Sequence, residues 1–450
     1  MFYAMQLERM LYLVLNRGKF DKRRVRGLLQ TVYSLDLAGR CLINKPPSPS
    51  ASSILPDRRK EEKAVFLGFT EVMRKPVYWI FDRLKNAHIV VVGIPGSGKS
   101  TLIKTLLVRA SKEFGANAVI IDFSAEYADW VRMAGGHVID LGGEDYFNIC
   151  EVGGLHPGVR VVQIVTALSI VFPELITHAP RQRRLLSKAI WEAYKQKGID
   201  RKDKRTWSRK PPTMRDVLRI LRDLIKEEED AEVKRSLYSL LGKLEEYTEP
   251  PLDVLAKEST ISLDEITESG LVDICLRKLP TDHIRALVAE TLIKFLAERF
   301  RQIGWLESKD LKCLLVLDEA YKVAEDEKCE AVTIVKEMRK YGIGVIVGTQ
   351  DYTDVSAKIT SNAGTVFVLQ LKDDNQVNTI SNSLGLSKRL RQRLLTLRQG
   401  EAVTFFSLER DYEPPFVLRV SPILPEKTVT VEFPEAPDFD YHLDALLRRV

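Results

Sequence analysis

The chain has 450 residues, of which 45% are hydrophobic and 29% are charged, and its formal net charge is +6. This length exceeds the usual limit of a single hydrophobic core, so we expect one large elaborated domain or two domains. No apolar run approaches the ~20 residues that cross a bilayer, and the first residues do not have the pattern of a signal peptide. The mild positive charge permits contact with nucleic acid or acidic lipid without requiring it.

The five cysteines are scattered and form no CxxC pair, and the six histidines have no metal-ligand spacing. This usage predicts reduced, mostly buried thiols and no structural zinc. We therefore expect a cytoplasmic protein, with a position at the inner surface of the cytoplasmic membrane as the alternative.

Residues 1–60 are predicted to form a helical arm and a linker. Residues 1–20 are rich in Leu, Met, Tyr and Phe but are interrupted by charges, which is typical of an amphipathic helix that docks on protein, on a partner or on a membrane surface. Residues 45–53 contain three prolines and four serines, a composition that predicts a linker or exposed loop without helix.

An α/β core is predicted for residues 61–156 and 262–423. An apolar strand at residues 88–92 precedes a helix that opens at residue 101, and further strands are predicted at residues 118–122 and 137–141. Strands that alternate with helices indicate a parallel sheet covered on both faces. Later strands are predicted at residues 270–276, 313–317, 344–347 and 365–369, with a long helix at 284–296 and a final hairpin of residues 402–406 against 416–420.

Residues 157–261 lack strand patterns and show apolar residues at helical spacing, so they are predicted to form an all-helical insertion in this core. Thr213 has the character of an N-cap before one of its helices. Residues 424–450 form a proline-rich, acidic C-terminal tail.

Residues 93–100 match the phosphate-loop pattern G-x-x-x-x-G-K-[ST] at every fixed position, between a predicted strand and a predicted helix. Glycines allow backbone amides to close around phosphate oxygens, and the helix N-terminus adds a favourable dipole. Lys99 is expected to reach the β- and γ-phosphates, and Ser100 to ligate Mg²⁺. The predicted nucleotide-binding residues are Gly93, Pro95, Gly96, Ser97, Gly98, Lys99, Ser100 and Thr101.

Asp318 and Glu319 follow four apolar residues of a buried strand and are the second half of the predicted site. Phosphoryl transfer to water needs one carboxylate on the metal and one on the attacking water. Two adjacent carboxylates at a strand end suit both tasks, with Asp318 on the Mg²⁺ side and Glu319 as the group that polarises water. The alternative is an exposed acidic turn.

Gln350 ends the strand that follows, and Arg339 comes just before that strand. In additional-strand P-loop ATPases this strand lies between the phosphate-loop strand and the acidic strand, so Gln350 is expected to face the γ-phosphate. Arg339 has the planar, permanently charged donors that suit phosphate oxygens, and in a ring of subunits it could reach a neighbour's site. A helix C-terminal cation is the simpler interpretation of Arg339.

Asp122 and Glu126 lie beyond the second strand of the core, close to the expected phosphate position. Either one could assist water or metal, and we assign Glu126 to the catalytic set. Alternatively, residues 124–126 simply begin a helix.

Residues 201–210 form a basic cluster with one aromatic residue, and smaller basic clusters lie at residues 181–184 and 388–393. Cations could pair with DNA phosphates, and an indole ring could stack on a base, although charge clusters are usually solvated surfaces. The candidate DNA-binding residues are Arg201, Lys202, Lys204, Arg205, Trp207, Arg209 and Lys210.

The ordered motifs over residues 64–422 resemble the HerA/FtsK group of ring-forming motor ATPases, which includes the conjugative and type IV secretion ATPases. The resemblance is carried by the approach to the phosphate loop, by Ile121-Asp122 with Glu126-Tyr127, and by Phe147-Asn148. The segment from Arg339 to Gln350 is its most diagnostic part, and residues 361–363 with the final hairpin complete the order.

The resemblance implies a RecA-like additional-strand P-loop NTPase, a homohexamer, and ATP hydrolysis with Mg²⁺ between subunits. It also implies DNA moving through a central channel, with Arg339 as a finger that acts in trans and Gln350 as a sensor. We expect this DNA to be double-stranded. End-processing motors of the group carry a β-barrel before the core, whereas residues 1–60 here are predicted to be helical. The start of the chain therefore resembles the DNA-transport branch more closely, in which a membrane channel is the partner.

The main functional hypothesis is a ring-forming, ATP-driven DNA translocase that powers DNA transport across a membrane. A HerA-like motor for DNA-end processing with a nuclease partner is the alternative within DNA motors. An ATPase that drives protein secretion or pilus assembly without DNA is the alternative of a different class.

Overall fold

The computed structural model describes residues 49–57, 61–173, 179–250, 252–303, 310–319, 323, 329–337, 341–410 and 413–423. The predicted arm over residues 1–44, the tail over residues 424–450 and Arg339 lie outside the described residues. No helix of the described part is long and apolar enough to cross a membrane.

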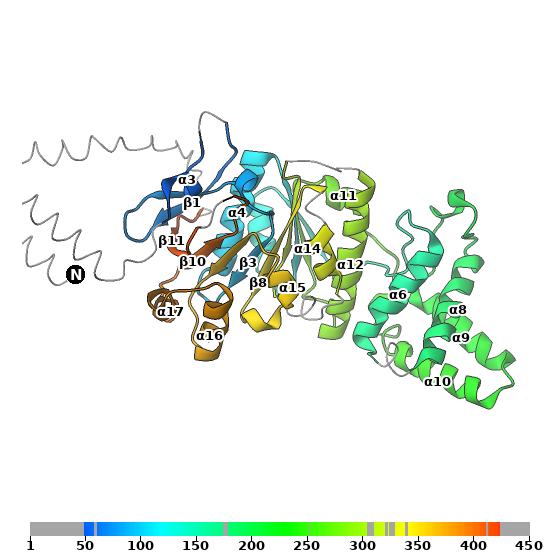
Figure 1. The fold of residues 1–450 in the computed structure, drawn as a ribbon. Coiled ribbons are helices and arrows are strands. Elements are labelled where there is room, and N and C mark those ends of the chain that lie inside the picture. Colours follow the sequence, from blue (N-terminus) through cyan, green and yellow to red (C-terminus); the bar gives the residue numbers. More distant parts are fainter. Residues whose placement is uncertain are drawn as a thin grey trace, which may run out of the picture.

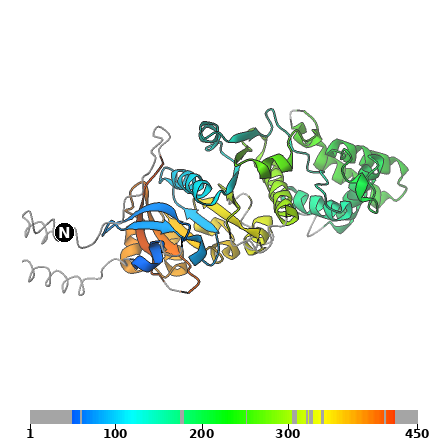
Figure 2. The same ribbon diagram turned by 90° about the horizontal axis from the view of Figure 1, so that it is seen from above.

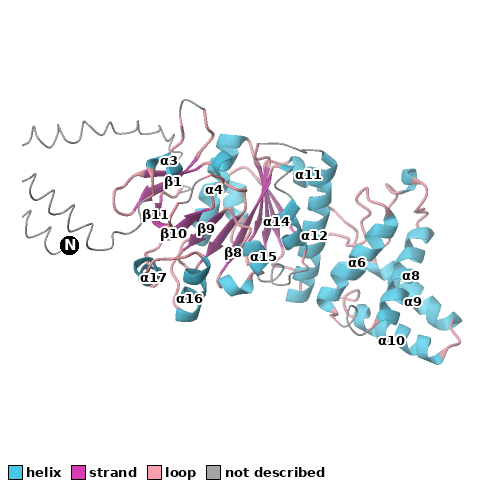
Figure 3. Ribbon diagram, in the orientation of Figure 1, coloured by secondary structure: helices cyan, strands magenta, loops and turns pink. Residues whose placement is uncertain are grey.

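One twisted sheet runs through the described part of the chain, with strands in the order β2-β1-β11-β10-β9-β3-β8-β7-β4-β6-β5 (Figures 1 and 3). From β9 to β5 every neighbouring pair is parallel, and from β9 back to β2 every pair is antiparallel. The parallel strands are β3 (Ile89–Val92), β4 (Asn117–Asp122), β5 (His137–Asp140), β6 (Leu271–Cys275), β7 (Cys313–Leu317), β8 (Ile343–Thr349) and β9 (Thr365–Val368). The antiparallel strands are β1 (Val65–Thr70), β2 (Pro76–Trp79), β10 (Glu401–Phe406) and β11 (Phe416–Val420).

The predicted α/β core with a parallel-dominated sheet is confirmed, and β8 lies between β3 and β7 as expected for an additional-strand P-loop NTPase. Strands β1 and β2 were not predicted. β2 has only four residues and begins with a proline. β1 bulges at Gly68. Any residue with a side chain at this position would place its Cβ 2.0 Å from the Arg419 carbonyl oxygen. Short, irregular strands of this kind lack a clear alternating pattern.

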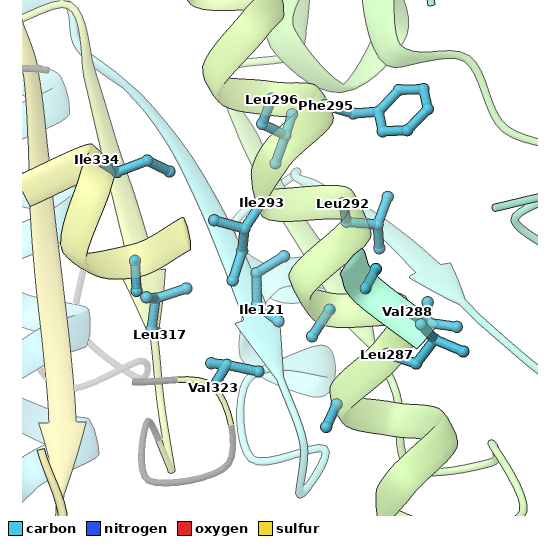
Figure 4. Packing of buried hydrophobic residues seen from close by; sticks show 14 of the residues in the cluster. Ile121, Leu287, Val288, Leu292, Ile293, Phe295, Leu296, Leu317, Val323 and Ile334 are labelled. Carbon is cyan, nitrogen blue, oxygen red and sulfur yellow. The ribbon is translucent and has the colours of Figure 1, made fainter. Parts of the chain in front are cut away.

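Helices cover both faces of the sheet because its central strands are apolar on both sides. Helix α4 (Lys99–Phe114) packs on one face, with its buried leucines against the odd-numbered residues of β3. On the other face α12 (Asp282–Ile303) and α14 (Glu330–Glu337) pack against β4 and β7, where Ile293 of α12 lies near Ile121 of β4 (Figure 4). Shorter helices, namely α5 (Ala128–Met133), α15 (Ala357–Thr360), α16 (Asp374–Ser383) and α17 (Lys388–Leu394), connect the strands.

Between β5 and β6 the described residues form helices and turns. These helices are α6 (Pro157–Val171), α8 (Pro180–Gln196), α9 (Met214–Glu227), α10 (Ala231–Glu245) and α11 (Leu263–Glu268). Helices α8, α9 and α10 project beyond α12, on the side away from β3, in both views (Figures 1 and 2). Thr213 caps α9 in a capping box with Asp216, as the sequence predicted.

A buried ion pair joins this helical segment to the core. The Arg160 guanidinium on α6 is 1% exposed, donates to Glu298 on α12 at 2.8 Å and stacks 3.4 Å from the Phe295 ring. Arg160 also donates to the Val152 carbonyl, so its charge is fully partnered. The base of the helical segment is therefore fixed by specific contacts.

The end of the predicted linker is helical, which corrects the expectation for residues 45–53. Helix α3 (Ala51–Ile54) buries Ile54 completely, and the Ser50 amide donates to Glu413 at 3.0 Å. The Ser53 hydroxyl also donates to the Glu413 carboxylate. Long-range contacts to a buried carboxylate supply the stability that the Pro/Ser composition does not, so composition alone was misleading here.

Candidate active site

The phosphate loop leaves β3 and is attached to the neighbouring strand β8. The Gly93 amide donates to the Thr349 carbonyl at 3.2 Å, so the loop begins directly beside the end of β8. Gly96 and Gly98 have φ of +76° and +106°, a region that L-residues with side chains rarely adopt. The two glycines thus explain why the chain can reverse here and enter α4.

The amides at the start of α4 are available to a ligand. Gly96, Gly98, Lys99 and Ser100 have no backbone acceptor for their N–H groups among the described residues. The Lys99 ammonium donates to the Gly93 carbonyl at 2.8 Å, across the concave side of the loop. Burial lowers the pKa of Lys99, while neighbouring carboxylates act in the opposite direction. Unpaired amides at a helix N-terminus with an ammonium beside them fit the phosphates of a nucleotide.

Asp318 and Glu319 follow β7 at the same edge of the sheet. Asp318 is 4% exposed, and burial raises its pKa to about 6. Its Oδ1 lies over Gly348 of β8. An alanine in place of Gly348 would put its Cβ 2.3 Å from this oxygen. The Glu319 amide donates to Asp318 Oδ1 at 3.1 Å, and Glu319 has a φ of +52°, in the left-handed region. Such a backbone costs on the order of 1–3 kcal/mol and is concentrated at functional sites.

Tyr127 reaches this carboxylate from the end of β4. Its side chain is completely buried, and its hydroxyl makes no hydrogen bond of normal length within the described residues. Burial and the neighbouring Asp318 raise the pKa of Tyr127 well above its usual range. The Tyr127 hydroxyl therefore keeps its proton and can donate it to an ionised Asp318 or to a ligand beside it.

Glu126 and Asp122 have different roles in the loop after β4. The Glu126 carboxylate accepts from the Ser100 hydroxyl, so it lies beside the predicted metal ligand. Asp122 is fully buried and accepts from the amides of Ser124, Ala125 and Tyr127 at 2.8–2.9 Å. All of its hydrogen-bonding capacity shapes this loop, so of the two carboxylates only Glu126 faces the site. Helix α5 begins after the loop, at Ala128.

Gln350 follows β8 and is exposed at the same edge. The register pairs Thr349 with Val92, so Gln350 lies next to the phosphate loop. Arg339, the predicted finger, lies outside the described residues. The structure thus brings together Lys99, Ser100, Glu126, Asp318 and Gln350, at the carboxyl ends of β3, β4, β7 and β8.

The candidate DNA-binding cluster lies in the helical segment, far from this edge, and several of its members have local partners. The Trp207 indole donates to the Asp200 carbonyl at 2.8 Å and packs edge-on against His156, so Trp207 holds its own loop together. Lys210 pairs with Glu258 at 2.7 Å, and Arg209 donates to the Gly198 carbonyl.

Sequence reasoning assigned no role to Tyr127 or Gly348, although both stand inside motifs that it quoted. The burial of the Tyr127 hydroxyl and the position of Gly348 beneath the Asp318 carboxylate depend on the pairing of β4, β7 and β8. The sequence alone does not show this arrangement. Gly400 was also missed: its amide donates to the Ser97 carbonyl at 3.2 Å, so the turn before β10 braces the phosphate loop.

Two family models match the chain. The first, Helicase HerA, central domain, matches residues 67–296, just over half of the chain. The chain belongs to the HerA central-domain family. A second model, TraM recognition site of TraD and TraG, matches residues 312–400. The HerA-family match includes the phosphate loop and the Glu126 loop, and the second match includes Asp318, Glu319 and Gln350.

Two curated relatives are similar over most of this HerA-family chain. The DNA import protein CedB of Sulfolobus acidocaldarius is 21% identical over 362 residues, which are 78% of this chain and 55% of CedB. The DNA double-strand break repair helicase HerA of Sulfurisphaera tokodaii is 22% identical over 339 residues, 72% of this chain and 63% of that protein. The chain thus spans somewhat more than half the length of these relatives.

Solved structures confirm the fold. VirB4 of Thermoanaerobacter pseudethanolicus superposes with a TM-score of 0.65 at 20% identity, over 80% of this chain and 97% of that one. The plasmid coupling protein TrwB in complex with ADP and Mg²⁺ superposes with a TM-score of 0.59 at 17% identity, over 85% of this chain and 96% of that one. This HerA-family chain therefore has the P-loop NTPase fold that VirB4 and TrwB share.

Proposed function

We propose that the edge formed by β3, β8, β7 and β4 binds ATP with Mg²⁺ and hydrolyses the γ-phosphate. The observation that carries this proposal is the convergence of Lys99, Ser100, Asp318 and Gln350 at one edge of the sheet. The loop amides and Lys99 hold the phosphates, and Ser100 and Asp318 hold the metal. Mg²⁺ neutralises charge on the phosphate oxygens when it is bound.

Glu319 accepts the proton of the attacking water in this proposal, because its carboxylate is next in sequence to that of the proposed metal ligand Asp318. Gln350 contacts the γ-phosphate and changes position when that group is lost. Glu126, beside the Ser100 hydroxyl, orients that metal ligand. Each role is a proposal for this chain, supported by the placement of the side chains along one edge.

We further propose that the chain is a subunit of a homohexameric motor that moves double-stranded DNA, with Arg339 completing the site of the next subunit. Membership of the HerA central-domain family supports this, as do the matches to a DNA import protein and to a DNA repair helicase. Among DNA motors we favour transport across a membrane, with a membrane channel as partner, because one of the two curated relatives, CedB, is a DNA import protein.

Hydrolysis of ATP by a sizing-column peak of known mass, with and without duplex DNA, tests this function. We expect a hexamer whose hydrolysis is stimulated by DNA and whose stimulation falls steeply with salt. A monomer with DNA-independent hydrolysis would contradict the motor and favour the secretion ATPase. Co-purification of a nuclease instead of a membrane protein would favour end processing, the activity that the similarity to HerA suggests.

The trans role of Arg339 is tested by mixing two inactive variants. Lys99→Ala subunits cannot hold phosphate, and Arg339→Ala subunits lack the finger, so a mixed ring contains some sites with both groups intact. We expect partial recovery of hydrolysis in the mixture. If no mixing ratio restores hydrolysis, Arg339 does not act across subunits.

A further inference from the structure

Charge is strongly segregated within the helical segment. Residues 180–210, which comprise α8 and the loop that follows, contain twelve Lys and Arg but only three Asp and Glu, a net charge of +9. Residues 211–261, which comprise α9 and α10, contain eight Lys and Arg and twelve Asp and Glu, a net charge of −4. The basic half alone exceeds the net charge of +6 of the whole chain, so this asymmetry is a local feature and not a general excess.

Most of the basic residues of α8 lie on one face of the helix, and Arg183 lies off it. Leu186, Ala189, Ile190, Ala193 and Tyr194 are buried against α6 and α9. At 100° per residue, Arg184, Lys188, Trp191 and Lys195 lie on the opposite side. Arg184, Lys188 and Lys195 are exposed, and they span about 16 Å along the axis.

Arg201 extends this face beyond the end of α8. Its guanidinium lies 3.8 Å from the centre of the Trp191 ring, and the Lys195 ammonium lies 5.8 Å from the same ring. Cation–π contact restricts a long cationic side chain without neutralising it. The half-buried Trp191 therefore organises two cations toward solvent, and Trp207, the aromatic residue that the sequence favoured, has no part in it.

Several of these cations have no acidic partner. Within the described residues, Lys195 pairs with Glu192, Arg205 with Asp203 and Lys197 with Asp216. In the same part of the chain no ion pair is seen for Arg184, Lys188, Arg201 and Lys202, which are all exposed. Among the described residues these cations stay unpaired, although the acidic half of the helical segment, residues 211–261, lies beside them. They are therefore available to an anionic partner.

The composition of the face indicates a phosphate polymer as that partner. Protein interfaces have an apolar or aromatic centre, whereas the exposed large hydrophobic residues of the described chain all lie outside residues 180–210. Arg and Lys in a row along a helix match the regularly spaced phosphates of nucleic acid. The acidic half formed by α9 and α10 repels the same polymer, which would fix the orientation of the helical segment on it.

We propose that the exposed face of α8, comprising Arg184, Lys188 and Lys195 together with Arg201 and Lys202, binds the phosphate backbone of duplex DNA outside the nucleotide site. This inference rests on the proposed function as a DNA motor. It gives the helical segment a task, namely to hold DNA at a distance from the sheet while hydrolysis proceeds at the edge of β3 and β8.

The test measures binding of the full-length chain to a labelled 30-base-pair duplex by fluorescence anisotropy over a range of KCl concentrations. The variant is Arg184→Glu/Lys188→Glu, and the matched control is Lys234→Glu/Arg235→Glu on α10, which makes the same change of charge in the acidic half. Each phosphate contact contributes about 0.9 to the slope of log K against log [KCl], so the variant should lose about 1.8 from that slope and at least about tenfold in affinity at low salt. The control should bind within about twofold of the wild type.

Variant and control that bind equally well would overturn the assignment to this face. If the wild-type chain binds duplex DNA tightly but only the control loses affinity, the contact surface lies in the other half. A wild-type chain that binds no DNA at any salt would refute the proposed motor function as well as the surface. Circular dichroism of each variant shows whether a loss of affinity comes from unfolding.

Discussion

Gly348→Ala is the substitution that most sharply tests the placement of the Asp318 carboxylate. The added Cβ would lie 2.3 Å from Asp318 Oδ1, whereas carbon and oxygen atoms that are not bonded do not approach closer than about 3.0 Å. The carboxylate must therefore move by at least about 0.7 Å, because the Cβ is fixed to the backbone of a central strand. Overpacking of this kind costs about 1–3 kcal/mol of stability.

The functional cost is larger than the cost in stability, because misplacing a catalytic group by about 1 Å can reduce the rate about 10²-fold. We expect Gly348→Ala to bind a fluorescent ATP analogue in EDTA like the wild type, since the phosphate loop is unchanged. Hydrolysis with Mg²⁺ should fall about 100-fold, and the Mg²⁺ concentration for half-maximal activity should rise.

Gly344→Ala is the matched control, because it lies on the same strand and is equally crowded. Its added Cβ would meet Leu314 Cδ2 at 2.7 Å and the Ala87 carbonyl oxygen at 2.8 Å, at the opposite end of β8 from the carboxylates. It should lower the melting temperature similarly while each folded molecule hydrolyses ATP at the wild-type rate. Equal activities of the two variants would refute the claim that Gly348 exists to admit Asp318.

Two further substitutions test buried groups near the sheet. Tyr127→Phe should raise the Mg²⁺ concentration for half-maximal nucleotide binding several-fold, because Asp318 loses the neutral hydroxyl group beside it. Tyr194→Phe, which removes the 2.6 Å hydrogen bond to the Cys150 carbonyl, should leave that concentration unchanged. Asp273 on β6 is buried without a hydrogen-bond partner in the described structure, and burial raises its pKa to about 8 from about 3.9 in the unfolded chain. The folded state therefore holds this proton more tightly, and its contribution to stability is complete below about pH 4 and is lost as the pH rises through about 8. Asp273→Asn should consequently flatten the melting temperature between pH 6 and 9, and a profile that matches the wild type would show that the carboxylate finds a partner.

Most of the α/β core could be predicted from sequence because its central strands are short apolar runs between helices. The strand at residues 313–317 was predicted with its observed bounds, and β8 took its place between β3 and β7. Strands β1 and β2 could not be predicted, since Pro76 and Gly68 break the pattern and β1 pairs with the distant strand β11.

Site residues could be predicted where they stand in short contiguous motifs. They could be predicted less well where their role depends on packing between distant segments. Lys99 and Ser100 stand in a fixed pattern, and Asp318 with Glu319 follows an apolar strand. Asp122 belongs to no such fixed pattern, and only its hydrogen bonds to three loop amides reveal that it shapes the Glu126 loop. Trp207 was chosen because it interrupts a basic run, yet its indole is committed to the Asp200 carbonyl. Sequence spacing does not report such contacts.

The central claim is that the phosphate loop at the end of β3 holds ATP, and that the carboxylates at the end of β7 bring about its hydrolysis by water. The most direct measurement compares Glu319→Gln with the wild type, using radiolabelled ATP to record binding and phosphate release on the same sample. We predict that Glu319→Gln binds ATP at least as tightly as the wild type and releases less than about 1% of the phosphate, as expected when the group that activates water is removed. Hydrolysis by Glu319→Gln at the wild-type rate would contradict the account.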